Sequence, residues 1–556
     1  MSATARAQTA DPAATPPGRA WRTRRLSPWW LTAAFGVAYV IVAPLSTDLA
    51  AAGYRSDLFS RAGLTLWDNG WYGGHHLPAY SLLAPPLGAL LGPQLLGALA
   101  MTLASALFGL LVAGRFTRRG ERIASLWFAL GAAVGLLSNR VPFELGVALA
   151  LGSLLAAQGR RGGGRSAWRL SSALALALLT PLASPLAGAF LALAAVAWAL
   201  ATDRRERPLA LGLALAALVP IALLAVAFPE GGSEPFAASA FYPVLAVLLA
   251  MAWAIPRQQR LVRVGVGLYA LVLCAAYAIP TAVGGNVDRL GALLAGPLLA
   301  CAAIGSSAER GRVRAMIVLC PLLLYWQLRA PIADYVSGAS DPASRAAYFT
   351  PLLGELERLR LGYDAQPARI EVVPTRNRAE ARWVADRVSI ARGWERQLDR
   401  HDGAVFYAQD GALSAASYRA WLSRNAISYV ALPDAPLDYS ARAEARLLRG
   451  GAGYLREVWR SRHWRLFAVR APTPLAQPPS AIERLQSDSF TLRAPRAGSF
   501  LVRVRFTPYW ALLDGHGCIR RGREGWTEVQ ARAGGSLRVG IDFSPTRVFS
   551  HGPRCR

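Results

Sequence analysis

Long apolar segments follow one another over residues 29–330 of this 556-residue chain. An α-helix needs about 20 apolar residues to cross a bilayer. Hydrophobic residues make up 53% of the chain and the mean hydropathy is +0.28, which is more than one large soluble core requires. The sequence therefore predicts a polytopic α-helical membrane protein with about eleven transmembrane helices. The predicted spans are 30–46, 93–114, 123–138, 141–158, 170–181, 185–201, 209–228, 236–255, 261–279, 290–304 and 313–328.

The charge of the loops alternates along these spans. All basic residues are Arg, and the formal net charge is +27. Arg clusters precede the first span and recur in every second loop, whereas the loops between them carry almost none. Because cytoplasmic loops are rich in basic residues, this pattern predicts a multi-pass plasma-membrane protein with a cytoplasmic N-terminus. The segment from Thr47 and everything after Leu328 are then extracytoplasmic, and the Arg residues indicate topology and not nucleic-acid binding.

Residues 1–28 are predicted to be a disordered cytoplasmic segment, because they begin with an Ala-, Pro- and Thr-rich stretch. No small-residue cleavage site follows the Arg-rich end of this segment, so the first span is predicted to be an uncleaved anchor.

After the last span the composition becomes that of a soluble protein. Strands alternate with helices over residues 346–471, which predicts a small extracytoplasmic α/β domain in which residues 378–391 are helical. A Pro-rich linker follows. Short alternating strands over residues 480–556 then predict an extracytoplasmic β-sandwich. Its aromatic residues Tyr509 and Trp510 could stack on a sugar, although core packing is the commoner use.

Two cysteines, Cys518 and Cys555, lie in this outer region. Disulfides form outside the cytoplasm, so these residues are predicted to pair and to tie down the C-terminus. Two unpaired thiols are the alternative.

The segment 47–93 is a polar and aromatic island in an apolar part of the chain. Its notable residues are Asp48, Asp57, Asp68, His75, His76, Trp67, Trp71, Tyr72 and Tyr80. An outward segment with several carboxylates beside many membrane spans suggests the catalytic loop of a membrane enzyme.

The sequence RSDLFSRAGLTLWDNGWYGGHHLPAYS, with FELG and SPLAG further along the chain, is similar to actinobacterial arabinosyl- and mannosyltransferase-like members of the GT-C superfamily of membrane glycosyltransferases. The order of a first outer loop, many spans and a C-terminal outer region also resembles that superfamily. The resemblance implies transfer of a sugar from a polyprenyl-phosphate donor to a cell-envelope glycan or lipid acceptor, with a loop carboxylate as general base. An acceptor hydroxyl has a high pKa, so a carboxylate within hydrogen-bond reach is needed as charge develops.

Asp57 is the first candidate for this base, because it lies between Arg residues about ten positions into the loop, where the superfamily's acidic residue is expected. Asp48 is the second, because it directly follows the first span. Asp68 lies in the turn-forming sequence WDNGWYGG and counts as a substrate-binding candidate or a turn residue.

Other side chains could hold the substrates. The Arg side chains could bind the donor phosphate through two hydrogen bonds, the aromatic rings could stack on sugar or lie at the membrane interface, and the His side chains could hydrogen-bond to phosphate or sugar. A carboxylate near the outer end of a span could face a cavity or pair with a neighbouring Arg. These candidates are Arg55, Arg61, Arg140, Arg289, Trp71, Tyr72, Tyr80, His75, His76 and Glu144.

No cofactor is predicted. The loop contains no DxD pair, two adjacent His residues cannot face one point on a regular helix or strand, and the sequence has no Walker, GxSxG, HExxH or paired-Cys motif. A divalent metal stays possible, but a single base without a metal fits these residues better.

Two other functions stay open. A lipid or solute transporter would show charged or broken helices near the membrane centre and internal repeats, which the sequence does not show. A non-catalytic envelope scaffold would bind glycan through the region after residue 346.

Overall fold

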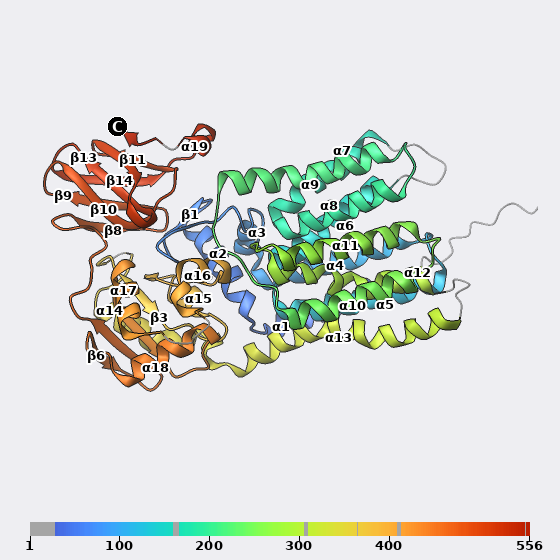
Figure 1. The fold of residues 1–556 in the computed structure, drawn as a ribbon, viewed down its shortest axis with the longest axis horizontal. Coiled ribbons are helices and arrows are strands. Elements are labelled where there is room, and N and C mark those ends of the chain that lie inside the picture. The colour runs from blue at the N-terminus through green and yellow to red at the C-terminus, as the bar shows by residue number, and fades with distance from the viewer. Residues whose placement is uncertain are drawn as a thin grey trace, which may run out of the picture.

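The computed structural model describes residues 28–158, 166–304, 310–363, 365–408, 413–550 and 552–555. A bundle of helices lies on one side of the molecule, and two β-containing domains from the last third of the chain lie on the other (Figure 1). We call the end of the bundle beside these domains the domain-facing end and the opposite end the far end. The predicted disordered segment 1–28 falls outside the described residues except for Pro28.

Every apolar segment predicted from the sequence forms a helix of the bundle. These helices are α1 (Trp29–Val42), α4 (Pro93–Val112), α5 (Arg118–Gly135), α6 (Val141–Ala157), α7 (Ala167–Ala183), α8 (Pro185–Ala201), α9 (Arg207–Ala227), α10 (Ala238–Ala254), α11 (Arg260–Ala278), α12 (Arg289–Ala303) and α13 (Arg310–Ser340). Two 3-10 turns, η1 (Leu136–Ser138) and η2 (Gly284–Asp288), lie at the domain-facing end.

Several of these helices can cross a bilayer. Among the described residues, five are long and apolar enough: α4, α5 with η1, α9, α11 and α13, and the bent pair of α1 and the helix after it can count as a sixth. Four more apolar helices, α6, α7, α8 and α10, are shorter. Large side chains such as Leu223 on α9 and Leu271 on α11 are exposed, as lipid-facing residues are. The chain is therefore a membrane protein, while the number of eleven spans stays a prediction.

The segment 47–93, predicted as a loop, is largely regular. It contains α2 (Thr47–Ala62), the short strands β1 (Trp67–Asp68) and β2 (His75–His76), and α3 (Ala84–Leu91). Ala43 adopts a left-handed conformation at the end of α1, and α2 then runs at 75° to α1. α2 is buried on several sides, at Leu49, Tyr54 and Leu58 among others, which explains why this polar-looking sequence is helical.

The α/β domain contains a five-stranded sheet in the order β4-β3-β5-β7-β6. Strands β3, β4 and β5 are parallel, and β7 pairs antiparallel with both β5 and β6. The strands are β3 (Arg369–Val372), β4 (Ser389–Ile390), β5 (Ile427–Pro433), β6 (Leu455–Arg460) and β7 (Trp464–Val469). The helices are α14 (Ala346–Arg358), α15 (Glu380–Trp383), α16 (Arg396–Asp402), α17 (Ala415–Arg424) and α18 (Arg442–Gly450).

The prediction of a helix over residues 378–391 is wrong for most of its length. Only α15 is helical, and Ser389 and Ile390 form β4 instead. Val384 and Val388 are spaced like residues on one helical face, but both belong to the core beneath the sheet. Pairing of Ile390 with β3 outweighs the local helical preference.

The C-terminal domain is a sandwich of two four-stranded sheets in the orders β10-β13-β12-β15 and β11-β14-β9-β8. Its strands are β8 (Ala481–Leu485), β9 (Ser489–Ala494), β10 (Gly498–Arg505), β11 (Trp510–Asp514), β12 (Gly517–Arg521), β13 (Trp526–Ala531), β14 (Gly535–Ile541) and β15 (Arg554–Cys555), and a short helix, α19 (Pro545–Phe549), precedes the last strand. Tyr509 and Trp510 are fully buried, so they pack in the protein and do not form a sugar platform. A disulfide joins Cys518 on β12 to Cys555 on β15.

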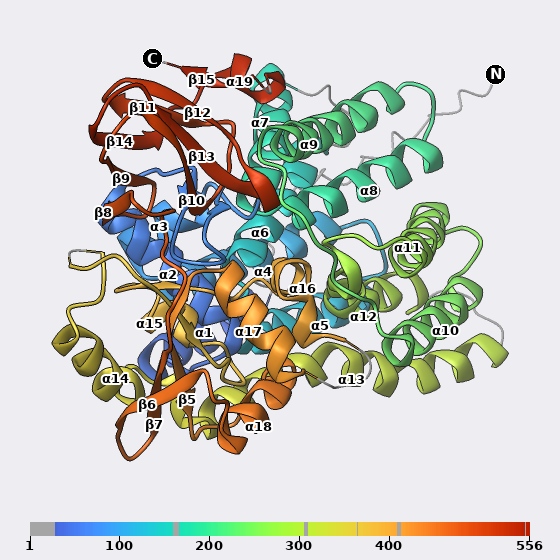
Figure 2. The ribbon, with the colours of Figure 1, turned by 60° about the vertical axis from the view of Figure 1, so that its left-hand side comes forward.

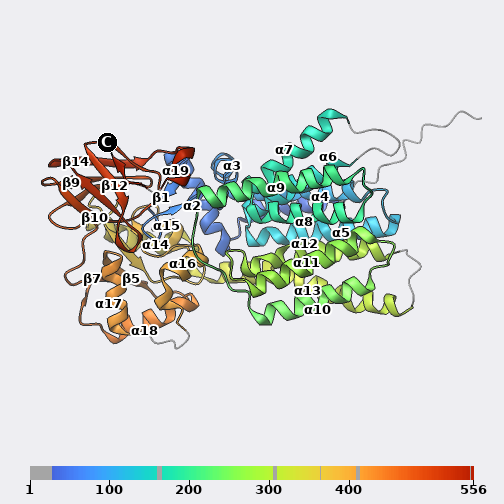
Figure 3. The same ribbon diagram turned by 45° about the horizontal axis from the view of Figure 1, so that its top comes forward.

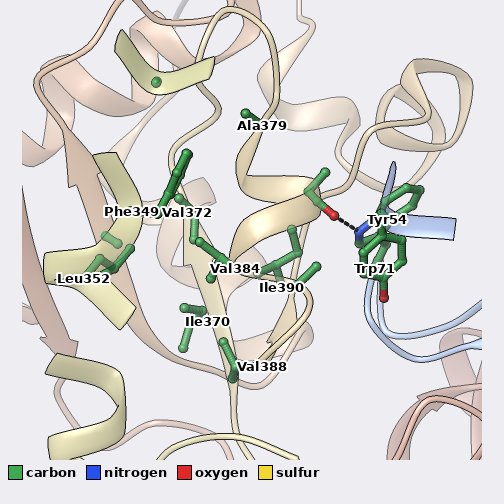
Figure 4. Close-up of a cluster of buried hydrophobic side chains, with 14 of the residues drawn as sticks. Tyr54, Trp71, Phe349, Leu352, Ile370, Val372, Ala379, Val384, Val388 and Ile390 are labelled. Atoms are coloured by element: carbon green, nitrogen blue, oxygen red, sulfur yellow. Dashed lines mark hydrogen bonds between the residues drawn. The ribbon is translucent and has the colours of Figure 1, made fainter. Parts of the chain in front are cut away.

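The β1–β2 hairpin connects all three parts of the molecule, and α2 and α3 lie between the bundle and the two domains (Figures 2 and 3). Trp67 is buried in the sandwich core, and Trp71 is buried in the core of the α/β domain. The Trp71 indole N–H donates to the carbonyl of Ala381 at 2.9 Å, and its ring stacks on that of Tyr54 from α2 (Figure 4). The outer domains are therefore fixed to the bundle through two buried tryptophans.

We expect Trp71→Ala to destabilise the outer half of the molecule. The side chain is fully buried, and Trp-to-Ala changes at such positions cost about 3–5 kcal/mol. Thermal unfolding of the detergent-solubilised protein and protease cleavage of its outer domains would measure the loss. Trp253→Ala is the matched control, since that ring is 58% exposed on α10. Equal unfolding temperatures for the two variants would contradict the role of Trp71 in stabilising the outer half of the molecule.

Candidate functional site

A cluster of charged side chains occupies the domain-facing end of the bundle. Asp48, in the first turn of α2, lies with its Oδ2 3.4 Å from Nε of Arg140, the residue that precedes α6. Nη2 of Arg140 lies 3.3 Å from Oδ2 of Asp334 on α13. The three side chains are 19%, 26% and 31% exposed in that order. The cluster is therefore accessible to a small molecule.

The backbone around this cluster is fixed by hydrogen bonds between segments far apart in the sequence. The Ser46 hydroxyl donates to the carbonyl of Ser138 at 2.9 Å, and the Ser138 hydroxyl donates to Asp334 at 2.6 Å. Asn139 donates to Ser46 at 2.9 Å. These contacts hold the start of α2, the turn before α6 and the end of α13 together, so Asp48 and Arg140 are positioned by three helices.

Tyr80 and Arg289 interact electrostatically with this charged cluster. Burial raises the pKa of Tyr80 to about 12, with Asp48 and Glu395 adding to the rise and Arg55 and Arg289 opposing it. Arg289 is the first residue of α12, donates to Asn286 at 2.6 Å, and lies over the ring of Phe143 at 5.8 Å. Tyr80 and Arg289 therefore lie within electrostatic reach of the Asp48–Arg140 pair.

Arg55 lies next to Tyr80. Its guanidinium lies 3.9 Å from the centre of the Tyr80 ring and forms a buried ion pair with Glu395 of the α/β domain. Burial raises the pKa of Glu395 to about 7 although Arg55 lowers it. Nε and Nη1 of Arg55 have no hydrogen-bond partner among the described residues. The α/β domain thus supplies a carboxylate beside the site.

Glu144 lies on α6, one helical turn past Arg140. Its side chain is 3% exposed, and neither carboxylate oxygen has a hydrogen-bond partner among the described residues. Gly97 of α4 leaves the space that this carboxyl group occupies. The Glu144 carboxyl group is therefore buried between α6 and α4. It does not point into the exposed part of the charged cluster.

Asp57 is not brought together with these residues. Its Oδ2 lies 3.1 Å from Nη2 of Arg382, on the face of α2 toward α15, and its side chain is 43% exposed. The first candidate for the base therefore faces away from the cluster that contains the second.

Five other candidates are buried in the junction between the domains. His75 stacks on Trp71 with ring centres 5.2 Å apart, and the Tyr72 hydroxyl donates to the carbonyl of Glu395 at 2.8 Å. His76 lies 3.0 Å from the Thr507 hydroxyl through Nε2. Burial lowers the pKa of His75 well below its ordinary value, so this ring is neutral. The prediction that Trp71, Tyr72 and the two His side chains contact a substrate is corrected: packing already occupies their surfaces.

Asp68, the fifth, is fully buried in the same junction. It accepts hydrogen bonds from the Tyr54 hydroxyl at 2.9 Å and from the Gly70 N–H at 3.0 Å. The Gly70 contact closes the turn that the sequence WDNGWYGG suggests. Asp68 therefore belongs to the turn and not to the accessible site.

Sequence reasoning missed three acidic residues of the site: Asp288, Asp334 and Glu395. Burial raises the pKa of Asp288, and Arg140 and Arg289 oppose this rise, which places it within their electrostatic reach. Asp288 directly precedes α12, and Asp334 lies on α13 six residues beyond the predicted span 313–328. Their positions just outside predicted spans are the signal that could have found them. Glu395 offers no such signal, because only folding of the α/β domain brings it to Arg55.

The described residues contain no group of three or more His, Cys, Asp and Glu side chains placed to hold a metal ion. Asp48 and Asp334 are each directed at Arg140, a cation.

Comparison with known proteins gives little guidance. No protein-family model matches the chain, and no curated protein matches it. Among solved structures, the chain is similar to the archaeal oligosaccharyltransferase AglB from Archaeoglobus fulgidus, which was solved in complex with an inhibitory peptide and a dolichol-phosphate. The identity is 14%, the match covers 73% of this chain and 69% of that chain, and the TM-score is 0.42.

Asp68 should make the stability of the protein depend on pH. Burial raises the pKa of Asp68 from 3.8 to about 6. The contribution of Asp68 to the free energy of unfolding is therefore fully present below pH 4 and is lost as the pH rises to about 6. A shift of this size corresponds to about 3 kcal/mol. Asp68→Asn keeps the shape and cannot ionise, so unfolding temperatures between pH 4 and 7 should decline less for this variant than for the wild type.

Asp57→Asn is the control for this measurement, since Asp57 is half-exposed and lies on the same helix as Tyr54. The unfolding temperature of Asp57→Asn should decline with pH as that of the wild type does. If the unfolding temperature of Asp68→Asn declines in the same way, the buried carboxyl group does not titrate in this range.

Proposed function

We propose that this protein is a membrane glycosyltransferase that transfers a sugar from a polyprenyl-phosphate donor to a cell-envelope glycan or lipid acceptor. The observation that supports this best is the Asp48–Arg140 pair, accessible at the domain-facing end of the bundle and flanked by Tyr80 and Arg289. A carboxylate and two guanidinium groups in one site provide both the base and the phosphate-binding groups that such a reaction needs. In this proposal the domain-facing end is on the outer side of the plasma membrane.

Asp48 is the general base in this proposal, and Asp57 is not. Asp48 is part of the charged cluster, whereas Asp57 is paired with Arg382 on another face of α2. The contact from Asp48 to Arg140 uses one carboxylate oxygen, Oδ2, at 3.4 Å. The other oxygen can accept the proton of an acceptor hydroxyl. Burial raises the pKa of Asp48, which favours its action as a base, and the positive charges of Arg140 and Arg289 oppose this rise.

Arg289 binds the donor phosphate in this proposal. It begins α12 at the level where a lipid phosphate meets the bundle, and its contact with Phe143 leaves the guanidinium beside an apolar surface that a prenyl chain can cover. Phosphate recognition by two parallel hydrogen bonds is a common role of Arg. Arg140, which Asp48 and Asp334 partly neutralise, can share the charge of the departing phosphate.

The reaction is then a single displacement. The acceptor oxygen attacks the anomeric carbon of the donor sugar while Asp48 takes the hydroxyl proton. The bond between that carbon and the phosphate oxygen breaks, its electron pair stays on the oxygen, and polyprenyl phosphate leaves. Arg289 and Arg140 stabilise the negative charge that develops on the leaving group.

Asp48→Asn should lower sugar transfer by a factor of about 10²–10⁴, the usual contribution of a positioned general base. Asp57→Asn is the matched control and should keep wild-type activity. The assay measures transfer from a radiolabelled polyprenyl-phosphate sugar by purified protein in detergent or nanodiscs. Full activity of both variants would reject a carboxylate base on α2. Transport of the labelled lipid, or glycan binding without turnover by the wild type, would support the transporter or scaffold function instead.

Arg289→Gln should mainly weaken donor binding. Loss of a charged hydrogen bond to phosphate raises the KM for the donor roughly tenfold or more, with a smaller change in KM for the acceptor. Arg61→Gln is the control, since Arg61 is half-exposed and paired with Asp386 away from the cluster. An unchanged donor KM in Arg289→Gln would show that the phosphate binds elsewhere.

A further inference from the structure

A large cavity lies inside the bundle, away from the charged cluster. Its volume is about 870 Å³, and its walls come from α4, α6, α8, α10, α11 and α12. Most of its lining side chains are Leu, Ala, Val and Phe. This volume is in the range of pockets that hold a whole small ligand, about 300–1,000 Å³.

The mainly apolar walls favour an apolar occupant. Protein interiors are close-packed, and voids much larger than a water molecule are few. Water does not fill the apolar part of such a space well, because apolar walls offer it too few hydrogen-bond partners.

The cavity opens at the far end of the bundle and closes toward the domain-facing end. Phe190 and Tyr269 line its closed part and are buried, and the Tyr269 hydroxyl donates to the carbonyl of Val287 at 2.9 Å. Arg115 and Leu261, which line the other part, are exposed. None of Asp48, Arg140 and Arg289 lines the cavity. The cavity does reach Leu290 and Gly291, directly after Arg289, but the lining at this end is largely buried, whereas the far end is exposed. An apolar chain therefore enters from the far end.

The polar residues at the opening indicate what kind of head group accompanies this chain. Arg115, Gln158 and Glu206 line the cavity there, at the ends of α4 and α6 and before α9. Exposed Arg residues surround the opening: Arg118, Arg119, Arg204, Arg205 and Arg260. Basic residues at a membrane surface attract anionic lipids.

We propose that the cavity binds one phospholipid from the leaflet at the far end, with an acyl chain inside the bundle and the phosphate beside Arg115. By the topology predicted from the Arg pattern, this is the cytoplasmic leaflet. The lipid is distinct from the sugar donor, whose phosphate binds at the opposite end of the bundle in the proposed function. Its chain completes the packing between α8, α11 and α12.

The test uses the full-length protein, stripped of lipid in detergent and titrated with dioleoyl-phosphatidylglycerol. Native mass spectrometry counts the lipids bound per chain, and thermal unfolding measures the accompanying stabilisation. Gly265→Leu on α11 fills the cavity, because a Cβ there meets only Ala197 at 3.8 Å. Gly267→Leu is the matched control, since Gly267 is exposed on the same helix and does not line the cavity.

The wild type and Gly267→Leu should each bind one lipid tightly and unfold at a higher temperature with it. Gly265→Leu should bind it at least tenfold more weakly, since it excludes several methylene groups from the cavity. Arg115→Gln should weaken binding severalfold, and Arg449→Gln, exposed on α18 of the α/β domain, should not. Ala194→Leu fills the cavity from α8 and repeats the test if Gly265→Leu does not fold.

Equal lipid binding by the cavity-filled variants and the wild type would overturn the proposal. So would retention of polyprenyl phosphate by the wild type but not by Gly265→Leu, with phosphatidylglycerol binding unchanged, because the cavity would then hold the donor chain. Loss of sugar transfer does not enter this test, so its result is independent of the proposed function.

Discussion

Trp67 and Trp71 stand four positions apart on one hairpin and are buried in the cores of two different domains. The hairpin begins only a few residues after α2, which carries Asp48, Arg55 and Asp57. The two indole rings therefore fix the α/β domain and the sandwich relative to the helix that carries the charged site. The contact between Arg55 and Glu395 depends on this arrangement, because its partners come from α2 and from the α/β domain.

The same junction explains why so many polar residues follow the first helix. Asp68 and His76 are buried and hydrogen-bonded to other residues of the molecule, and His75 is buried and stacks on Trp71. Buried polar groups need partners, and hydrogen-bonded networks make an interface specific. A cluster of Asp, His and Trp in a sequence looks like a catalytic loop, but here most of it forms an interface between domains. The accessible chemistry is confined to Asp48, Tyr80 and the Arg residues beside them.

The two ends of the bundle differ in charge and in packing. At the domain-facing end, helix ends from distant parts of the sequence place carboxylates around Arg140. Toward the far end, the helices diverge around an apolar cavity whose opening carries Arg115. Charge is therefore concentrated at one end of the bundle and apolar volume toward the other.

The sequence by itself determined the membrane helices, because each apolar run needs only its own backbone hydrogen bonds and a lipid environment. It also determined the order of an α/β domain and a β-sandwich, from the alternation of their strands and turns. It could not determine that residues 378–391 contain β4, because pairing with β3 outweighs the local preference there. Nor could it choose between Asp48 and Asp57. That choice depends on the 75° bend before α2 and on partners more than 90 positions away, Arg140 for one and Arg382 for the other. Such contacts depend on where the folded chain brings distant segments together, and only the tertiary structure fixes that.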